Sequence, residues 1–408
     1  MLSQKTIFKN FARSHYVFIL FLLSSAIFLI SLSGCSDQSA KNSKNSLQSG
    51  RPGEIASSIC KAKYIEEIFI PDTIRLSIPS RYSLAAIHSL NISSNKNIVL
   101  IEFNSEIVLY FDSTGNFIKK IGGRGKGPGE FTYPRFCGFD KDGKIFIGDF
   151  SQRKISIFDK YGDFSKSFLV NNMIGGMLVF SDGQIVINDQ ELAKAMDHET
   201  IFMYSDQGNL LKKFGSPSSG MKELKNLPIM TSLFKGPYLT VYDNHIFETD
   251  YVDYHIKKYD MAGNFIMKFG EEPKHWNSVL NTNYRQIPAS QMVTPEVIKK
   301  LDKFFVEFGK HTIIEWLTVL PTGIIVSMSQ PYRNDNAKNI YFSFYDLNGN
   351  LLNNGLAFKN DKLLLNNFEM QIKPLAQGFC LIQFLTDISK ETTISEGENQ
   401  IIKLIIFN

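Results

Sequence analysis

The stretch Tyr259-Asp260-Met261-Ala262-Gly263-Asn264-Phe265 combines an aromatic residue, a polar turn and a glycine. Similar stretches occur at 111–117, 158–164, 204–210 and 345–351. Their glycines recur about every 50 residues, with one gap of nearly twice that length, and such a period is typical of a closed array of small sheets or of a solenoid. The segments between the turns are short and rich in Ile, Phe, Val and Tyr, which favours strands.

Each repeat divides into four short strands joined by turns rich in Asp and Gly. The five complete repeats cover 86–122, 134–169, 174–215, about 235–270, and 312–356. A sixth begins near residue 368 and has room for only three strands, whereas a strand-like segment, 73–78, precedes the first repeat without a sheet of its own. Pairing the two would leave no open edge. We therefore predict an all-β fold, a six-bladed β-propeller with four-stranded antiparallel blades, in which an N-terminal strand completes the last blade and closes the ring.

One segment departs from the β pattern. Thr294 is a suitable N-cap, Pro295 suits the first helical position, and apolar residues then recur on one face as far as Gly309. We predict a helical insertion, 271–311, between the fourth and fifth blades.

The N-terminus has the composition of an export signal. A basic head with Lys5, Lys9 and Arg13 precedes an apolar run, 16–32. The run ends in Leu32-Ser33-Gly34-Cys35, which resembles the lipobox of bacterial lipoproteins, so Cys35 is the predicted lipidation site. A membrane-spanning helix is the alternative. We predict a signal peptide at 1–34, a flexible Ser- and Asn-rich tether at 35–62, and the propeller at 63–408.

Charge and cysteine content narrow the class of partner. Removing the signal peptide lowers the formal net charge from +4 to +1, because the leader holds three basic and no acidic residues. A nucleic-acid partner is therefore not expected. Cys60, Cys137 and Cys380 form no CxxC pair, which argues against a disulfide framework or a zinc site.

Two further stretches carry a resemblance to a known family. They are 121–131, Ile-Gly-Gly-Arg-Gly-Lys-Gly-Pro-Gly-Glu-Phe, followed by Pro134, and 143–149, Gly-Lys-Ile-Phe-Ile-Gly-Asp. With the repeated turn they make the chain resemble six-bladed propeller lipoproteins related to NHL-repeat proteins. The resemblance implies the fold and a place in the cell envelope, and it implies no particular ligand. Ser36 after the lipidated cysteine, by analogy with lipoprotein sorting, favours the outer membrane.

The long connections should gather on one side of the ring. They are 122–133, 188–199, 271–311, 329–339 and 386–399. In antiparallel blades, the connections between blades and those between strands two and three emerge on the same side. We call this side the long-loop face and predict that it binds the ligand. The alternative is that long loops accumulate there only because they are tolerated.

Two groups of residues are candidates for ligand contact. Arg124, Lys126, Glu130 and Arg135 lie in or next to the connection 122–133, which we call the crossing loop. Its glycines do not have phosphate-loop spacing, so we expect a flexible crossing between blades. The second group, on the insertion and its neighbours, has the composition of interface anchors or sugar platforms and is expected to be exposed. It consists of Trp276, Tyr284, Tyr332 and Arg333.

An acidic residue ends the second strand of four blades. The four are Glu102, Asp149, Asp189 and Asp250, and the fifth and sixth blades have Ser329 and Phe384 there. Such carboxylates could bind a hard cation such as Ca²⁺, or each could accept backbone hydrogen bonds in its own blade. One acid per blade fits the structural role better, so we predict no cofactor and keep Ca²⁺ as the alternative.

The predicted function is a non-enzymatic binding or scaffolding module for a protein or glycan ligand, held at the outer membrane by lipid. The chain has neither a Gly-x-Ser-x-Gly elbow nor a His-x-x-x-His pair. A propeller hydrolase or lyase with a divalent cation in the central channel is the alternative.

Overall fold

The computed structural model describes most of the chain that follows the predicted tether. The described residues are 58–69, 71–84, 86–102, 104–189, 199–217, 238–249, 254–273, 276–278, 311–330, 339–357, 370–375, 378–384 and 400–407. The predicted signal peptide, Cys35 and the helix expected from Thr294 lie outside them.

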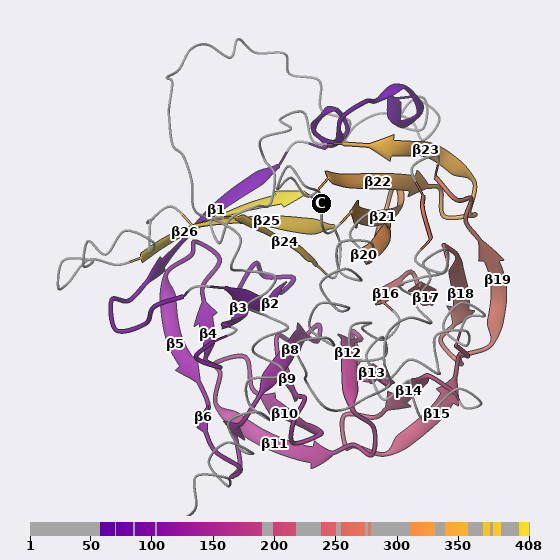
Figure 1. Ribbon diagram of the computed structural model, residues 1–408. Coiled ribbons are helices and arrows are strands. Elements are labelled where there is room, and N and C mark those ends of the chain that lie inside the picture. Colours follow the sequence, from indigo (N-terminus) through magenta and orange to yellow (C-terminus); the bar gives the residue numbers. More distant parts are fainter. Residues whose placement is uncertain are drawn as a thin grey trace, which may run out of the picture. The chain divides into compact units, whose positions relative to one another are not determined.

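The chain folds into six four-stranded antiparallel sheets, so the predicted six-bladed β-propeller is confirmed (Figure 1). Blade 1 contains β2 (Ile87–Ile92), β3 (Ile98–Glu102), β4 (Val108–Phe111) and β5 (Phe117–Ile121). Blade 2 contains β8 (Pro134–Phe139), β9 (Ile145–Asp149), β10 (Lys154–Phe158) and β11 (Phe164–Leu169). Blade 3 contains β12 (Ile174–Val179), β13 (Ile185–Asp189), β14 (Ile201–Tyr204) and β15 (Leu210–Phe214).

The remaining three blades continue the series (Figure 1). Blade 4 contains β16 (Tyr238–Tyr242), β17 (His245–Thr249), β18 (Ile256–Asp260) and β19 (Phe265–Phe269). Blade 5 contains β20 (Ile313–Leu320), β21 (Gly323–Gln330), β22 (Asn339–Tyr345) and β23 (Leu351–Leu356). Blade 6 contains β24 (Met370–Pro374), β25 (Phe379–Phe384), β26 (Gln400–Phe407) and, from the other end of the chain, β1 (Asp72–Ile78).

Ring closure by the N-terminal strand is visible in the register of β1. It pairs with β26 along its whole length, from Asp72 opposite Ile406 to Ile78 opposite Gln400. Leu76 and Ile78 are fully buried in a core that also contains residues of blade 1. The strand therefore completes blade 6 and joins it to blade 1.

The hydrophobic core is divided among the interfaces between blades. In the described part of the chain, six buried clusters each contain residues of two neighbouring blades. Between blades 3 and 4, for example, Phe214 stacks edge-on against Tyr259 with ring centroids 5.2 Å apart. Radial repetition therefore gives every sheet its own buried interface, which is how the fold accommodates a chain of this length.

The repeated glycine is explained by the same interfaces. Gly263 has φ +72°, and a Cβ atom there would approach Phe214 Cδ1 to 2.6 Å. Gly349 lies in the same way against Phe269 of the preceding outermost strand, and Gly115 lies against the carbonyl of Arg75 in β1. The turn needs a residue whose backbone is in the left-handed conformation. The preceding blade also leaves no space for a side chain, so both constraints favour glycine.

The segment before β1 packs against blade 5. Ile59 is fully buried and belongs to the cluster of Phe342 and Phe379, and Asn353 donates hydrogen bonds to the carbonyls of Ile59 and Ala62. The segment includes a short 3-10 helix, η2 (Ile65–Glu67). Residues 58–62, which the sequence assigns to the tether, are therefore in contact with the propeller.

The three cysteines of the described region differ in burial. Cys60 is exposed and free, whereas Cys137 and Cys380 are buried and free. Burial raises the pKa of the Cys137 thiol to about 12, and it raises the pKa of Cys380 as well. Both act as small core residues.

Candidate functional site

The crossing loop is an ordered structure, which corrects the expectation of a flexible connection. Its two arms form a short parallel ladder between β6 (Gly123–Arg124) and β7 (Glu130–Phe131). The Lys154 ammonium donates to the carbonyls of Gly127 and Glu130, at 3.2 and 2.8 Å. This lysine is 6 % exposed, and burial lowers its pKa although nearby Asp149 and Glu130 act in the opposite direction. The loop is thus fixed from the third strand of blade 2, which the local glycine content does not reveal.

Asp149 holds the other end of the crossing loop. Its carboxylate accepts hydrogen bonds from the backbone amides of Thr132, Tyr133 and Gln152 at 2.7, 3.1 and 2.9 Å. The Ser151 hydroxyl donates at 3.1 Å. Burial alone would raise the pKa of Asp149, but these hydrogen bonds together outweigh it and lower the pKa. The carboxylate stays ionised and ties the loop to blade 2.

Arg135 packs against two aromatic rings beside this loop, and the rings themselves meet edge to face with centroids 5.9 Å apart. Its guanidinium carbon is 4.4 Å from the ring centroid of Phe150 and 4.6 Å from that of Tyr133. Its Nη2 donates to the Tyr133 hydroxyl at 3.0 Å, and its buried Nε has no hydrogen-bond partner among the described residues. We call Tyr133, Arg135 and Phe150 the arginine clamp.

The other candidates of the crossing loop have different surroundings. Arg124 and Lys126 are exposed, and Glu130 accepts a hydrogen bond from the Gly127 amide at 2.8 Å. Glu106, from the turn of blade 1, lies near enough for electrostatic contact with Arg124. Burial raises the pKa of Glu106, Arg124 lowers it and Asp149 raises it, so that the sum lies above the ordinary value. Basic and acidic side chains therefore both lie along the crossing loop.

Arg135 occupies a β-bulge, and the same bulge recurs in other innermost strands. The register of β8 shifts between Pro134 and Phe136, so Arg135 has no partner in the ladder. Equivalent shifts occur in β2, β12 and β20, and the extra residues are His88, Gly175 and Glu315. Bulges redirect side chains at the rims of sheets and next to sites. Sequence reasoning missed this feature, because four different residue types share the position.

The acidic positions accept hydrogen bonds from nearby groups where the structure describes them. Glu102 accepts hydrogen bonds from the amide and hydroxyl of Ser105, and Asp189 accepts one from Asn172 at 2.7 Å. Asp250 lies outside the described residues. Within the residues that the structure describes, no group of three His, Cys, Asp or Glu side chains could hold a metal ion.

The aromatic candidates are described in part. Trp276 is half-buried rather than exposed, because its ring packs against Tyr254 with centroids 5.2 Å apart. Tyr284, Tyr332 and Arg333 lie outside the described residues. Trp276 therefore contributes to the core around blades 4 and 5.

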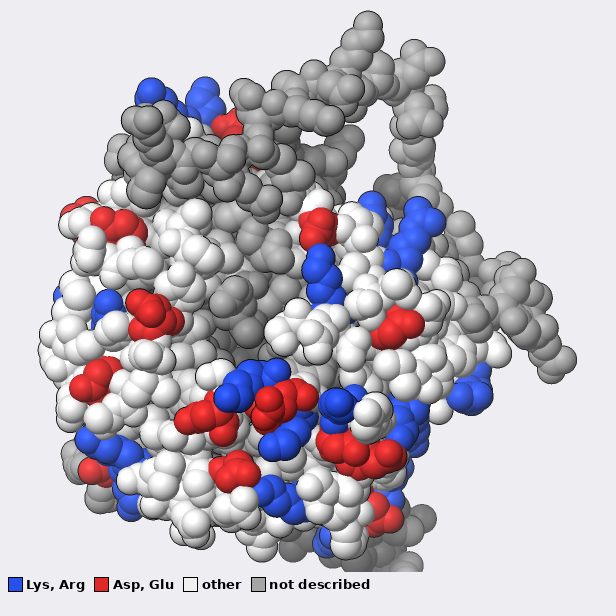
Figure 2. All heavy atoms as spheres, turned by 180° about the vertical axis from the view of Figure 1, so that it is seen from behind, with Lys and Arg blue, Asp and Glu red and all other residues white. Residues whose placement is uncertain are grey.

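The charged surface is mixed. Figure 2 shows the face behind the view of Figure 1, where basic and acidic side chains lie next to one another over the described residues.

No helix in the described ranges is both long and apolar enough to cross a bilayer.

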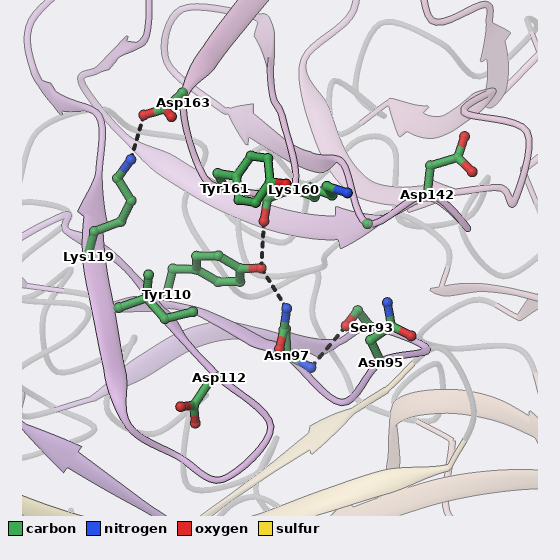
Figure 3. A pocket seen from close by; sticks show the side chains of 12 residues that line it. Ser93, Asn95, Asn97, Tyr110, Asp112, Lys119, Asp142, Lys160, Tyr161 and Asp163 are labelled. Carbon is green, nitrogen blue, oxygen red and sulfur yellow. Dashed lines mark hydrogen bonds and ion pairs between the residues drawn. The ribbon is translucent and has the colours of Figure 1, made fainter.

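A pocket that the sequence did not indicate lies between blades 1 and 2 (Figure 3). It has a volume of about 680 Å³, opens to solvent, and is formed by the tight turns of both blades and by β5. The Tyr110 hydroxyl donates to the carbonyl of Lys160 at 3.0 Å and accepts from Asn97 Nδ2 at 2.8 Å. The two blades are thereby joined at the bottom of the pocket.

These features define the class of protein: a six-bladed β-propeller with an ordered crossing loop, an arginine clamp and a polar inter-blade pocket. Residues 58–169 match the model of a family described as "6-bladed beta-propeller". The match covers blades 1 and 2 and the closing strand, where the structure places the crossing loop.

Two solved structures show the same fold across most of the chain. A protein from Bacteroides fragilis described as a "putative exported protein" aligns with a TM-score of 0.56 and 14 % identity, over 85 % of this chain and 97 % of its own. A member of the DUF4221 family from Bacteroides vulgatus aligns with a TM-score of 0.50 and 7 % identity, over 83 % of this chain and 97 % of its own. No curated protein matches this sequence. At such identities the likeness is one of fold, and function has to be argued from the site.

Proposed function

We propose that the chain is a lipid-anchored binding module of the cell envelope that holds a protein or glycan ligand on its long-loop face. The observation that carries the proposal is the arginine clamp. Within the described residues, the guanidinium of Arg135 makes one hydrogen bond although it has five N–H donors. An arginine packed against two rings loses little conformational freedom when it binds, so its donors are pre-organised for a ligand.

The neighbouring hydroxyl adds to the same chemistry. Tyr133 accepts the hydrogen bond from Arg135, which leaves its own proton available for an acceptor. Tyr133 and Arg135 belong to residue types that concentrate binding energy at interfaces. Asp149 fixes the backbone of Tyr133, so the group is held in place before a ligand arrives. The clamp therefore suits a ligand that offers carboxylate, carbonyl or hydroxyl oxygens.

The test compares Arg135→Ala with Arg75→Ala in the full-length lipoprotein. Arg75 is exposed on β1 of blade 6, so its removal changes the net charge equally without touching the clamp. After capture from the native envelope, we expect a partner or glycan that is recovered with the wild type and with Arg75→Ala. Its yield should fall by about tenfold or more with Arg135→Ala, the result of losing roughly 1.4 kcal/mol of binding free energy.

Two outcomes would count against the proposal. Equal recovery of the same ligand by both variants would remove the clamp from the binding site. Recovery of only unspecific envelope proteins by every form would argue against a binding module. Melting curves of both variants check that each is folded.

The anchor is tested separately through Cys35. The lipobox Leu32-Ser33-Gly34-Cys35 supports acylation, and the apolar run before it supports export. Metabolic labelling with an alkyne fatty acid should mark the wild type and not Cys35→Ser. Density-gradient fractionation should place the labelled form in the outer membrane. A labelled Cys35→Ser chain would contradict the anchor and leave the clamp untouched.

A further inference from the structure

The inter-blade pocket is separate from the arginine clamp and has a rigid frame (Figure 3). The Tyr110 side chain is 1 % exposed, and its hydroxyl uses both its donor and an acceptor position on the two blades. At the outer end, the Lys119 ammonium pairs with Asp163 of blade 2 at 2.5 Å. The pocket is therefore formed before any ligand binds.

The carboxylate of Asp112 belongs to this frame. It accepts hydrogen bonds from the amides of Thr114 and Asn116 and from both of their side chains. Although burial acts to raise its pKa, these hydrogen bonds lower the pKa to about 2. Asp112 thus stays ionised, and its contacts stabilise its own turn.

Three polar side chains of the lining are open to solvent. Among the described residues, the side chains of Asn95, Asp142 and Lys160 make no hydrogen bond or ion pair, and all three are exposed. An amide, a carboxylate and an ammonium group provide acceptors and donors in one pocket. A ligand that satisfies all of them must itself both donate and accept hydrogen bonds.

An exposed aromatic ring completes the lining. Tyr161 is 63 % exposed, and the Lys160 ammonium lies 5.1 Å from its ring centroid. Figure 3 shows the two side chains next to each other on the blade 2 side of the pocket. Other large apolar side chains of the described surface are exposed as well, Leu169 among them, and the face of the Tyr161 ring offers an apolar platform.

We infer that this pocket binds a neutral saccharide, with its hydroxyl groups on Asn95, Asp142 and Lys160 and its C–H face on Tyr161. A sugar presents hydroxyls that donate and accept, together with an apolar face, which matches the lining. Phosphorylated or nucleotide ligands fit poorly, because Asp112, Asp142 and Asp163 oppose the two lysines. The volume lies within the range of small-molecule sites.

The experiment uses the full-length protein in detergent and a panel of neutral trisaccharides built from glucose, mannose, xylose and N-acetylglucosamine. Saturation-transfer NMR identifies the binder, and calorimetry measures its Kd. We expect Tyr161→Ala to weaken the affinity by about tenfold or more, because the stacking platform is lost. Asp142→Asn should weaken it several-fold.

The matched control is Phe265→Ala, which removes an aromatic residue that is 59 % exposed on β19 of blade 4. Its affinity should equal that of the wild type, and so should that of Arg135→Ala, which separates this site from the clamp. Absence of binding by every trisaccharide would overturn the inference. So would equal affinities for Tyr161→Ala and Phe265→Ala.

Discussion

Leu76→Ala should destabilise the whole propeller, because the ring depends on β1. Leu76 is fully buried in the core shared by blades 6 and 1, two residues from buried Ile78. Truncating a buried leucine costs about 3 kcal/mol when the cavity does not collapse. One kcal/mol lowers the Tm by about 2–4 °C in a domain of 150–250 residues and by less in a larger one, so we expect a fall of about 5 °C.

The control makes the same Leu→Ala substitution at an exposed position. Leu169→Ala removes the same atoms from a side chain that is 71 % exposed on β11, and its Tm should stay within about 1 °C of the wild type. Deleting the strand would be a less specific test, since the segment with Ile59 and Ile65 precedes it and also packs on the propeller. All variants are compared by calorimetry at one scan rate, because unfolding of a chain of this size can be irreversible.

The result that would refute the reasoning is a Leu76→Ala protein that melts together with Leu169→Ala and stays monomeric. Strand β1 would then contribute nothing to the stability of blade 6. The ring would have to be closed by other contacts, and the interpretation of the sixth repeat as three strands plus one would be wrong.

Two further predictions concern the repeated turn and the crossing loop. Gly263→Ala should lower the free energy of unfolding by about 2–4 kcal/mol, because alanine is strained in the left-handed conformation and its Cβ would clash with Phe214. At Gly123 a Cβ would meet nothing within 4 Å, so Gly123→Ala should leave the free energy of unfolding nearly unchanged in chemical denaturation. Asp149→Asn should lower the free energy of unfolding by about 1–3 kcal/mol at pH 7, because the charge-assisted hydrogen bonds to the carboxylate are lost. The folded-state pKa of Asp149 is lowered, so its contribution is present above the unfolded value of 3.8 and is lost as the pH falls through the folded value. The difference between wild type and variant should therefore shrink in urea titrations below about pH 4, and a constant difference would contradict the assignment.

The architecture was predictable because its physical causes recur at a fixed spacing. Each turn glycine meets the preceding blade. The aspartate three residues before it, or Ser205 in blade 3, accepts the amides of its own turn, as Asp346 does from Asn348 and Asn350. These requirements are local and act once per blade. They produce a regular spacing in the sequence, from which the number of sheets can be counted. The same spacing shows that the sixth repeat lacks its fourth strand.

The candidate site was predictable only in part, because its geometry depends on contacts between distant residues. Arg135 and Glu130 were identified from the crossing loop, but the rigidity of that loop comes from Lys154. The inter-blade pocket joins Asn97 and Tyr110 to a turn about 50 residues further along the chain, so no local motif reports it. Ile59 shows the same limit, since one apolar residue in a polar tether does not reveal the surface against which it packs.

The positions that break the repeat are the best guide to function. The residue before the turn glycine is Thr, Gln, Ala or Asn in four blades and Tyr161 in blade 2, where the ring lies exposed. The Gly-Pro-Gly-Glu sequence likewise occurs once, in the crossing loop next to Arg135. A residue needed for the propeller itself would recur, since every blade meets the same packing problem. Tyr161 and the arginine clamp do not recur, and both lie at blade 2, so the packing that all blades share does not account for them.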